Sequence, residues 1–172
     1  MLFVLLLMPM VLVAQRTEER VYKTVAGTDL TMQIMYPEAA TKGGSLPGMI
    51  FFHGGGWSGG SPEQFANQGR YFARRGLLCF LPEYRLAEKH GATPFQSLED
   101  AKSAIRYVKQ HAADFGLDSS RVIAAGGSAG GHLAAATALV AGYNSPHDPP
   151  GISPVPVALV LFNPVIDNGP GG

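Results

Sequence analysis

The sequence is poor in the residues that mark disulfide-stabilised, metal-binding and nucleic-acid-binding proteins. Its 172 residues include one cysteine, so neither an internal disulfide nor a cysteine-based metal site can form. Its 13 basic and 13 acidic residues cancel to a formal net charge of zero, which leaves no broad positive surface for a phosphate backbone or an anionic membrane. We therefore expect no nucleic-acid partner, no metal ion and no cofactor, and we interpret Cys79 as an unreactive core residue.

The sequence also lacks an apolar run long enough to span a membrane. The longest run, residues 2–13, is shorter than the ~20 residues of a spanning helix and resembles the apolar region of a signal peptide. No Lys or Arg precedes it, and Leu12 stands where a small residue is usual, so an N-terminal strand or anchor is the alternative. We expect cleavage after Ala14 and a secreted or periplasmic protein, with residues 1–19 as signal and lead-in and the fold starting near Arg20.

What the sequence does contain is an alternation of strand and helix patterns in a single domain, residues 20–172. Hydrophobic residues make up 46% and charged residues 15%, which is enough apolar surface for one core. Strands are expected at residues 21–25, 30–36, 49–52, 77–81, 122–125 and 157–162, and helices at 61–75, 98–115 and 129–141. This order predicts an α/β fold with a mostly parallel sheet covered on both faces and an antiparallel hairpin at one edge.

Local signals support the helix boundaries. Ser61 and Gln64 have the spacing of a capping box, in which each side chain binds a free amide of the first helical turn. Gly76 is expected to end that helix in the left-handed conformation. Glu99 and Asp100 are expected to open the next helix, where acidic side chains favour the positive end of the helix dipole.

The chemistry is concentrated in Gly126-Gly127-Ser128-Ala129-Gly130, a G-x-S-x-G pentapeptide between an expected strand and an expected helix. A strand-to-helix turn this sharp needs glycines beside the serine, and it holds the hydroxyl above the sheet edge. The helix after Ser128 directs its free amides and positive dipole end at the place where an oxyanion would form. Ser128 is therefore the candidate nucleophile.

A second motif, His53-Gly54-Gly55-Gly56-Trp57, directly follows the expected strand 49–52. Glycines there let backbone amides approach a carbonyl oxygen, and this arrangement accompanies the serine turn in lipases and esterases. We assign Gly54, Gly55 and Ala129 as the oxyanion donors. His53 is expected to fix the loop by hydrogen bonding, and Trp57 either lines the acyl pocket or covers the edge of the sheet.

The sequence resembles the α/β-hydrolase esterases related to hormone-sensitive lipase. Four segments together carry this resemblance: HGGGW, Tyr84-Arg85-Leu86, the helix 98–108 and GGSAGGH. Among these esterases, the sequence is most similar to secreted bacterial carbohydrate esterases that cleave acetyl or feruloyl esters. The similarity covers residues 21–167. It implies an α/β-hydrolase fold, Ser128 as nucleophile, and metal-independent hydrolysis of short acyl esters, with a small-molecule or carbohydrate ester as substrate.

The acid and the base of the catalytic triad have no matching positions. In this fold they follow the serine in the order Asp or Glu, then His, on loops after later strands, and we expect the chain to be the N-terminal part of a longer enzyme. His132 lies one helical turn after Ser128, where its ring should point along the helix. Asp167 is a candidate acid only if the acid sits one strand early, and otherwise it is a turn residue.

The other histidines carry no catalytic signal. His111 is expected at a helix C-terminus, and His90 and His147 are expected in loops without metal-ligand spacing. A non-catalytic hydrolase-like binding protein and a serine peptidase of the same fold are the alternative functions. The sequence decides neither the acyl and alcohol specificity nor the oligomeric state.

Overall fold

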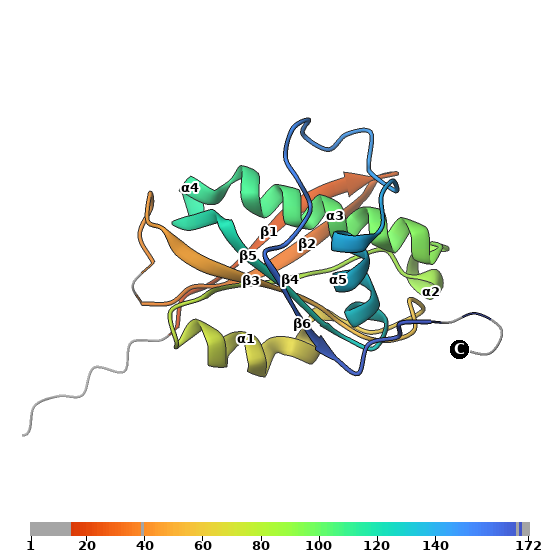
Figure 1. The fold of residues 1–172 in the computed structure, drawn as a ribbon, viewed down its shortest axis with the longest axis horizontal. Coiled ribbons are helices and arrows are strands. Elements are labelled where there is room, and N and C mark those ends of the chain that lie inside the picture. Colours follow the sequence, from red (N-terminus) through yellow and green to blue (C-terminus); the bar gives the residue numbers. More distant parts are fainter. Residues whose placement is uncertain (1–14, 39, 168, 170–172) are drawn as a thin grey trace, which may run out of the picture.

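Six strands form one sheet in the order β1-β2-β4-β3-β5-β6 (Figure 1). The computed structural model describes residues 15–38, 40–167 and 169. The strands are β1 (Thr17–Val25), β2 (Thr28–Met35), β3 (Leu46–Phe52), β4 (Leu78–Pro82), β5 (Leu117–Gly127) and β6 (Ala158–Phe162). The helices are η1 (Pro62–Phe65), α1 (Ala66–Ala73), α2 (Ala87–His90), α3 (Pro94–Gln110), α4 (Ala112–Phe115) and α5 (Ala129–Leu139).

The strand directions confirm the predicted α/β architecture. β4, β3, β5 and β6 run parallel to one another, whereas β1 and β2 form an antiparallel hairpin that joins the sheet through an antiparallel β2–β4 pair. The carboxyl ends of β3 and β5 therefore lie side by side, with Phe52 opposite Gly126. This register brings the segment after β3 next to the segment after β5.

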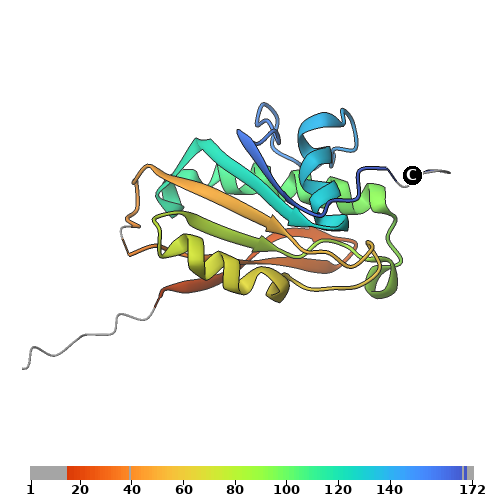
Figure 2. The ribbon, with the colours of Figure 1, turned by 60° about the horizontal axis from the view of Figure 1, so that its bottom comes forward.

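Helices cover both faces of the sheet, with α1 on one side and α3 and α5 on the other (Figure 2). Successive residues of a strand point to opposite faces. In β3, Ile50 and Phe52 belong to the core cluster beneath α3 and α5, and Phe51 belongs to the cluster beneath α1. All three are fully buried, which explains the unbroken apolar run that predicted this strand.

Four strands, β1, β2, β3 and β5, begin earlier than expected, and the differences are largest for β1 and β5. β1 starts at Thr17 rather than near Arg20, because backbone pairing of Thr17 with Met35 does not require apolar side chains on an edge strand. The polar residues 17–20 alternate between exposed and partly exposed positions, so their side chains face solvent while the ladder continues. β5 starts at Leu117, five residues before the expected Val122: Leu117 pairs with Leu46, and the polar, exposed residues 119–121 lie at an irregularity in the β3–β5 pairing before the regular register begins at Val122.

The expected start of the first helix is wrong in its details. The chain from Pro62 first forms η1, and the Ser61 side chain makes no capping hydrogen bond. The α-helical part, α1, covers only Ala66–Ala73, and Gly76 has the left-handed φ of +92° that was predicted. The side chain of Gln64 does not cap a helix, because it is engaged elsewhere.

The expected start of the next helix is also wrong. Thr93 caps α3 with Gln96 in a reciprocal capping box, so Glu99 and Asp100 lie in the second turn, beyond the reach of the free N-terminal amides. These two carboxylates instead form ion pairs with Lys23 and Arg85. The apolar stripe of α3 is as predicted, and its buried members are Leu98, Ala101, Ile105 and Val108.

Cys79 is buried in β4, as expected of a core residue. Burial raises the pKa of its thiol to about 12, so the reactive thiolate is absent at neutral pH. The described part of the chain contains no helix long and apolar enough to cross a membrane. It also contains no group of three or more histidine, cysteine or acidic side chains arranged to hold a metal ion.

Candidate active site

Ser128 occupies a sharp turn between the last residue of β5 and the first residue of α5. Its φ of +53° and ψ of −122° are unusual for a residue with a side chain, and such strain is typical of functional turns. Added Cβ atoms show why the flanking positions are glycines. A Cβ on Gly126 would lie 2.3 Å from the Gly130 carbonyl oxygen, and one on Gly130 would lie 2.1 Å from the Phe52 carbonyl oxygen. The sequence prediction that glycines are required here is confirmed.

The turn exposes Ser128 and buries Ala129 directly behind it. The Ser128 amide donates to the carbonyl of Phe162 at 3.0 Å, and its carbonyl accepts from His132 at 3.0 Å within the helix. The turn is thus fixed between β6 and α5 while the hydroxyl stays accessible. The Ala129 amide lies at the N-terminus of α5, where the helix dipole favours negative charge.

The glycine loop, residues 53–58, follows β3 and passes close to this turn. A Cβ added to Gly54 would lie 3.0 Å from the Gly127 carbonyl oxygen and 3.3 Å from the Cβ of Ser128, which is tighter than ordinary contact, so a glycine favours this approach. Gly55 has a φ of +124°, and a Cβ there would lie 2.1 Å from the Gly59 carbonyl oxygen. The structure therefore brings Gly54, Gly55, Ser128 and Ala129 together, as expected from the two motifs.

An open cavity of about 510 Å³ lies at this junction. Its lining combines the two glycine segments with apolar and amide side chains: Gly54, Gly55, Gln64, Phe65, Gln68, Gly127, Ser128, Phe162 and Asn163. The rings of Phe65 and Phe162 contact each other with centroids 5.7 Å apart, and they form its apolar wall. The cavity therefore offers both an apolar surface and hydrogen-bonding groups beside the serine.

His53 is buried and supports the glycine loop. Its Nδ1 lies 2.8 Å from the Gly54 carbonyl oxygen, and its ring stacks on Tyr84 with centroids 4.3 Å apart. The Tyr84 hydroxyl donates to the His53 carbonyl at 2.7 Å. Burial lowers the pKa of His53, so the ring is neutral at pH 7. These contacts agree with the structural role expected for this histidine.

Gln64 is a site residue that the sequence analysis missed. Its Oε1 accepts a hydrogen bond of 2.5 Å from the Gly54 amide, so one of the three expected oxyanion donors already has a partner. Gly54 can donate to a substrate only when Gln64 releases it. The capping-box spacing with Ser61 concealed this role, because the pairing of Gln64 with Gly54 depends on the tertiary fold.

Trp57 lies at the far end of the glycine loop in the left-handed region, with a φ of +58°. Its ring is 9% exposed, belongs to the core beneath α3 and α5, and meets the His132 ring edge-on at 5.3 Å. Its indole nitrogen is buried without a hydrogen-bond partner among the described residues. Trp57 is not one of the residues that line the cavity, and the described aromatic rings that do line it are Phe65 and Phe162.

The comparison with protein families decides where this chain belongs. The model of a family described as BD-FAE matches residues 32–149, more than half of the chain, and this stretch contains both glycine motifs. The chain belongs to the BD-FAE family. Its fold is the α/β-hydrolase fold, because esterases of known structure share it at high similarity.

Individual relatives of this BD-FAE chain are esterases. It is 33% identical over 135 residues to the carboxylesterase NlhH of Mycobacterium tuberculosis, covering 77% of this chain and 41% of that protein. It is 42% identical to propionate-bound esterase 2 of Thermogutta terrifontis, with a TM-score of 0.87, covering 91% of this chain and 57% of that one. Esterase 2 phosphorylated by paraoxon gives a TM-score of 0.85 at 43% identity over 87% of this chain and 57% of that one. The BD-FAE chain thus spans between two-fifths and three-fifths of the length of these relatives.

No described histidine side chain of the BD-FAE chain forms a hydrogen bond with the Ser128 hydroxyl. His132 instead places its Nδ1 2.8 Å from the Val165 carbonyl oxygen, which agrees with the packing role expected of it. His111 caps the C-terminus of α3 as predicted. His90 is the last residue of α2 rather than a loop residue, and its Nδ1 accepts from the Leu86 amide at 2.9 Å. Its imidazole holds this short helix in place.

The remaining candidates also have local roles. His147 is exposed in the connection between α5 and β6, and its amide donates to the Ser145 hydroxyl at 3.3 Å. Asp167 accepts from the Gly169 amide at 2.8 Å, as expected of a turn residue. The described residues therefore bring together the candidate nucleophile and the candidate oxyanion donors, but none of the described histidine side chains is hydrogen-bonded to the Ser128 hydroxyl.

Proposed function

We propose that the protein is a serine esterase that cleaves carboxylic esters through an acyl-enzyme. The observation that carries this proposal is the exposed Ser128 at the N-terminus of α5, directly opposite the glycine loop. Ser128 Oγ attacks the ester carbonyl, and the oxygen of the resulting tetrahedral intermediate accepts from the amides of Gly55 and Ala129, joined by Gly54 when Gln64 releases it. The alcohol leaves with a proton, and water then releases the acid from Ser128.

In this mechanism the base and its orienting acid come from residues beyond the 172. A serine hydroxyl needs a hydrogen-bonded base to become a nucleophile, and the described histidines are engaged by backbone groups or lie away from Ser128. The esterase relatives, of which the chain spans only part, support this assignment.

The proposed substrates are esters of short acyl groups, including acetyl esters on carbohydrates. The rings of Phe65 and Phe162 provide a short apolar wall for the acyl group. Gln68 and Asn163 add amides that suit a hydroxylated alcohol. Propionate, an acid of three carbons, is bound in one similar esterase, and this supports a short acyl site.

A chain-length series tests this proposal in a form of the protein that continues past Gly172. We expect kcat/KM on p-nitrophenyl esters to be highest for two to four acyl carbons and to fall by roughly tenfold or more at eight carbons, because even a single methylene that does not fit costs about 1 to 3 kcal/mol. Phe65→Ala should shift the optimum to longer chains. A maximum at eight carbons or longer in the unmodified protein would reject the short acyl site, and absence of ester hydrolysis would reject the function.

We also propose that the protein is exported. This rests on the apolar run 2–13 and the polar residues after it, which lie outside the described residues except for their last part. The strand β1 starts at Thr17, so cleavage after Ala14 would leave the whole sheet intact. N-terminal sequencing of the protein from the periplasm or medium should begin at Gln15, and a cytosolic product that retains the run would contradict export.

A further inference from the structure

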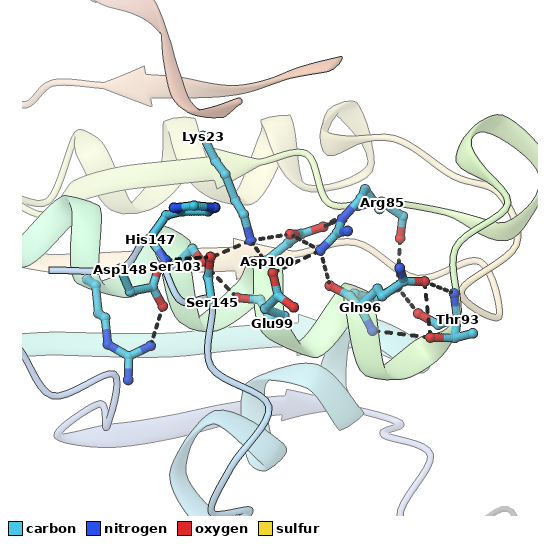
Figure 3. A network of polar contacts seen from close by, with 12 residues as sticks. Lys23, Arg85, Thr93, Gln96, Glu99, Asp100, Ser103, Ser145, His147 and Asp148 are labelled. Atoms are coloured by element: carbon cyan, nitrogen blue, oxygen red, sulfur yellow. Dashed lines mark hydrogen bonds and ion pairs between the residues drawn. The ribbon is translucent and has the colours of Figure 1, made fainter. Parts of the chain in front are cut away.

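Asp100 is a fully buried carboxylate that joins three segments of the fold. Its side chain is 0% exposed. Its Oδ1 accepts from Lys23 Nζ of β1 at 2.7 Å, and its Oδ2 accepts from the backbone amide and Nε of Arg85 at 3.0 and 2.7 Å (Figure 3). Asp100 thus ties the N-terminal hairpin and the segment after β4 to α3. A single carboxylate holds both the main chain and the side chain of Arg85.

The charges in this cluster compensate one another. Glu99 accepts from the same two cations, at 2.9 Å from Lys23 and 3.2 Å from Arg85, so two positive and two negative groups meet (Figure 3). Lys23 and Arg85 are only 8% and 12% exposed. The hydrogen bonds that the Arg85 side chain donates to Asp100 raise the pKa of Arg85. Removal of one carboxylate would leave buried positive charge in excess, which is costly in a desolvated site.

The segment after β4, residues 84–88, contains Arg85 and is hydrogen-bonded to the glycine loop. On one side of Arg85, the Tyr84 hydroxyl donates to the His53 carbonyl at 2.7 Å and its ring stacks on His53. On the other side, the Ala87 amide donates to the Trp57 carbonyl at 2.9 Å, and the Glu88 amide donates to the carbonyl of Ser58 at 3.2 Å. Segment 84–88 therefore binds both ends of the loop that contains Gly54 and Gly55.

We propose that Asp100 is a positioning residue for the oxyanion hole, which it acts on through Arg85 and segment 84–88. The oxyanion amides work only if they are already aimed at the place where negative charge develops, so the loop must be held before substrate arrives. Asp100 does not touch the substrate cavity. Its role rests on the proposed esterase function. Asp100 lies 45 or more positions in sequence from Gly54 and Gly55, the donors of the glycine loop that it would position.

A second buried ion pair on α3 provides a matched control. Arg106 Nη1 lies 2.6 Å from Asp148, and the two side chains are 10% and 11% exposed. Asp148 belongs to the connection between α5 and β6, and Arg106 also binds Asn144 and the Ile152 carbonyl of that connection. Asp148→Asn therefore weakens a comparable buried pair on the same helix without changing segment 84–88.

Trp57 allows the test to be made on the chain as it stands. It is the only tryptophan in the sequence, and it belongs to the glycine loop. Asp100→Asn removes the charge but keeps the shape of the side chain. We expect its folded form, checked by far-UV circular dichroism, to show Trp57 emission at longer wavelength and stronger acrylamide quenching, while Asp148→Asn keeps the native emission. Arg85→Lys, which keeps the charge but loses the fork held by Asp100, should shift the emission in the same direction.

The outcomes separate positioning from simple stabilisation. Native Trp57 emission in both folded Asp100→Asn and folded Arg85→Lys overturns the proposal, whatever their melting temperatures. If Asp100→Asn does not fold, Trp57 emission in Arg85→Lys alone decides the test: a shift to longer wavelength supports the proposal, and native emission overturns it. In the hydrolytically active form, Asp100→Asn should lower kcat by up to about 10²-fold with little change in KM. A protein that hydrolyses no ester but shows the emission shift refutes the esterase function and leaves the control of the loop by Asp100 intact.

Discussion

Replacement of Ser128 by alanine is expected to lower kcat on short acyl esters by on the order of 10⁶-fold, the loss measured when the nucleophile of another serine hydrolase is removed. The reason is that no other exposed hydroxyl group among the cavity-lining residues can form the acyl-enzyme. The measurement is hydrolysis of p-nitrophenyl acetate by the form that continues past Gly172. Ser120→Ala, at an exposed position in β5, should leave kcat unchanged.

Hydrolysis by the 172-residue chain alone is a second test of this prediction. Without a base, its rate should stay within roughly 10³ to 10⁴-fold of the uncatalysed reaction, which is what binding and oxyanion donors supply after loss of a triad member. Ser128→Ala should then have little further effect. Full activity of the 172-residue chain that depends on Ser128 would show that a base is present within these residues, contrary to the mechanism proposed.

Replacement of Gly55 by alanine is expected to lower kcat by about 10² to 10³-fold, the usual loss for one oxyanion donor. A methyl group at this position would lie 2.1 Å from the Gly59 carbonyl oxygen, and the φ of +124° disfavours any side chain. The loop must therefore shift, and the Gly55 amide turns away from the carbonyl that it should bind. The readout is kcat on p-nitrophenyl acetate, with KM expected to change little.

Gly56→Ala is the control for backbone strain. Gly56 also has a positive φ, +61°, but nothing lies within 4 Å of the added Cβ, so its loop can remain in place. We expect a much smaller loss of kcat for Gly56→Ala than for Gly55→Ala. Equal losses would mean that strain in the loop, and not the direction of the Gly55 amide, sets the rate.

The parts of the site that could be predicted are those formed by residues adjacent in the sequence. The turn at Ser128 has a φ of +53° and brings the backbone of Gly130 into close contact with its neighbours. Such a turn requires glycines around the serine, and these glycines are visible in the sequence as a short motif. The loop that contains Gly55 is likewise recognisable as a run of glycines after an apolar strand. The α/β architecture was predictable because a strand buried on both faces, such as β3, must be apolar at every position.

The parts that were missed depend on residues distant in sequence. Gln64 has the spacing of a capping residue but binds Gly54 across a turn, and no periodic pattern predicts that choice. Glu99 and Asp100 were assigned to a helix start because acidic residues are favoured there, whereas Thr93 provides the actual cap. The early start of β1 was missed because backbone pairing at the edge of a sheet leaves polar side chains in solvent.

The contact between Lys23 and Asp100 also orders the events of folding. The two residues are 77 positions apart, and at about 5 to 20 residues per second the ribosome needs roughly 4 to 15 s to make the chain between them. Until α3 has been made, the hairpin β1–β2 lacks the helix whose residues share a core cluster with Leu30, Met32 and Ile34. The first strand of the sheet to be synthesised thus depends on a helix that is made much later. The hydrogen bonds by which Asp100 holds Arg85, next to the residues that bind the glycine loop, therefore cannot form before α3 has been made.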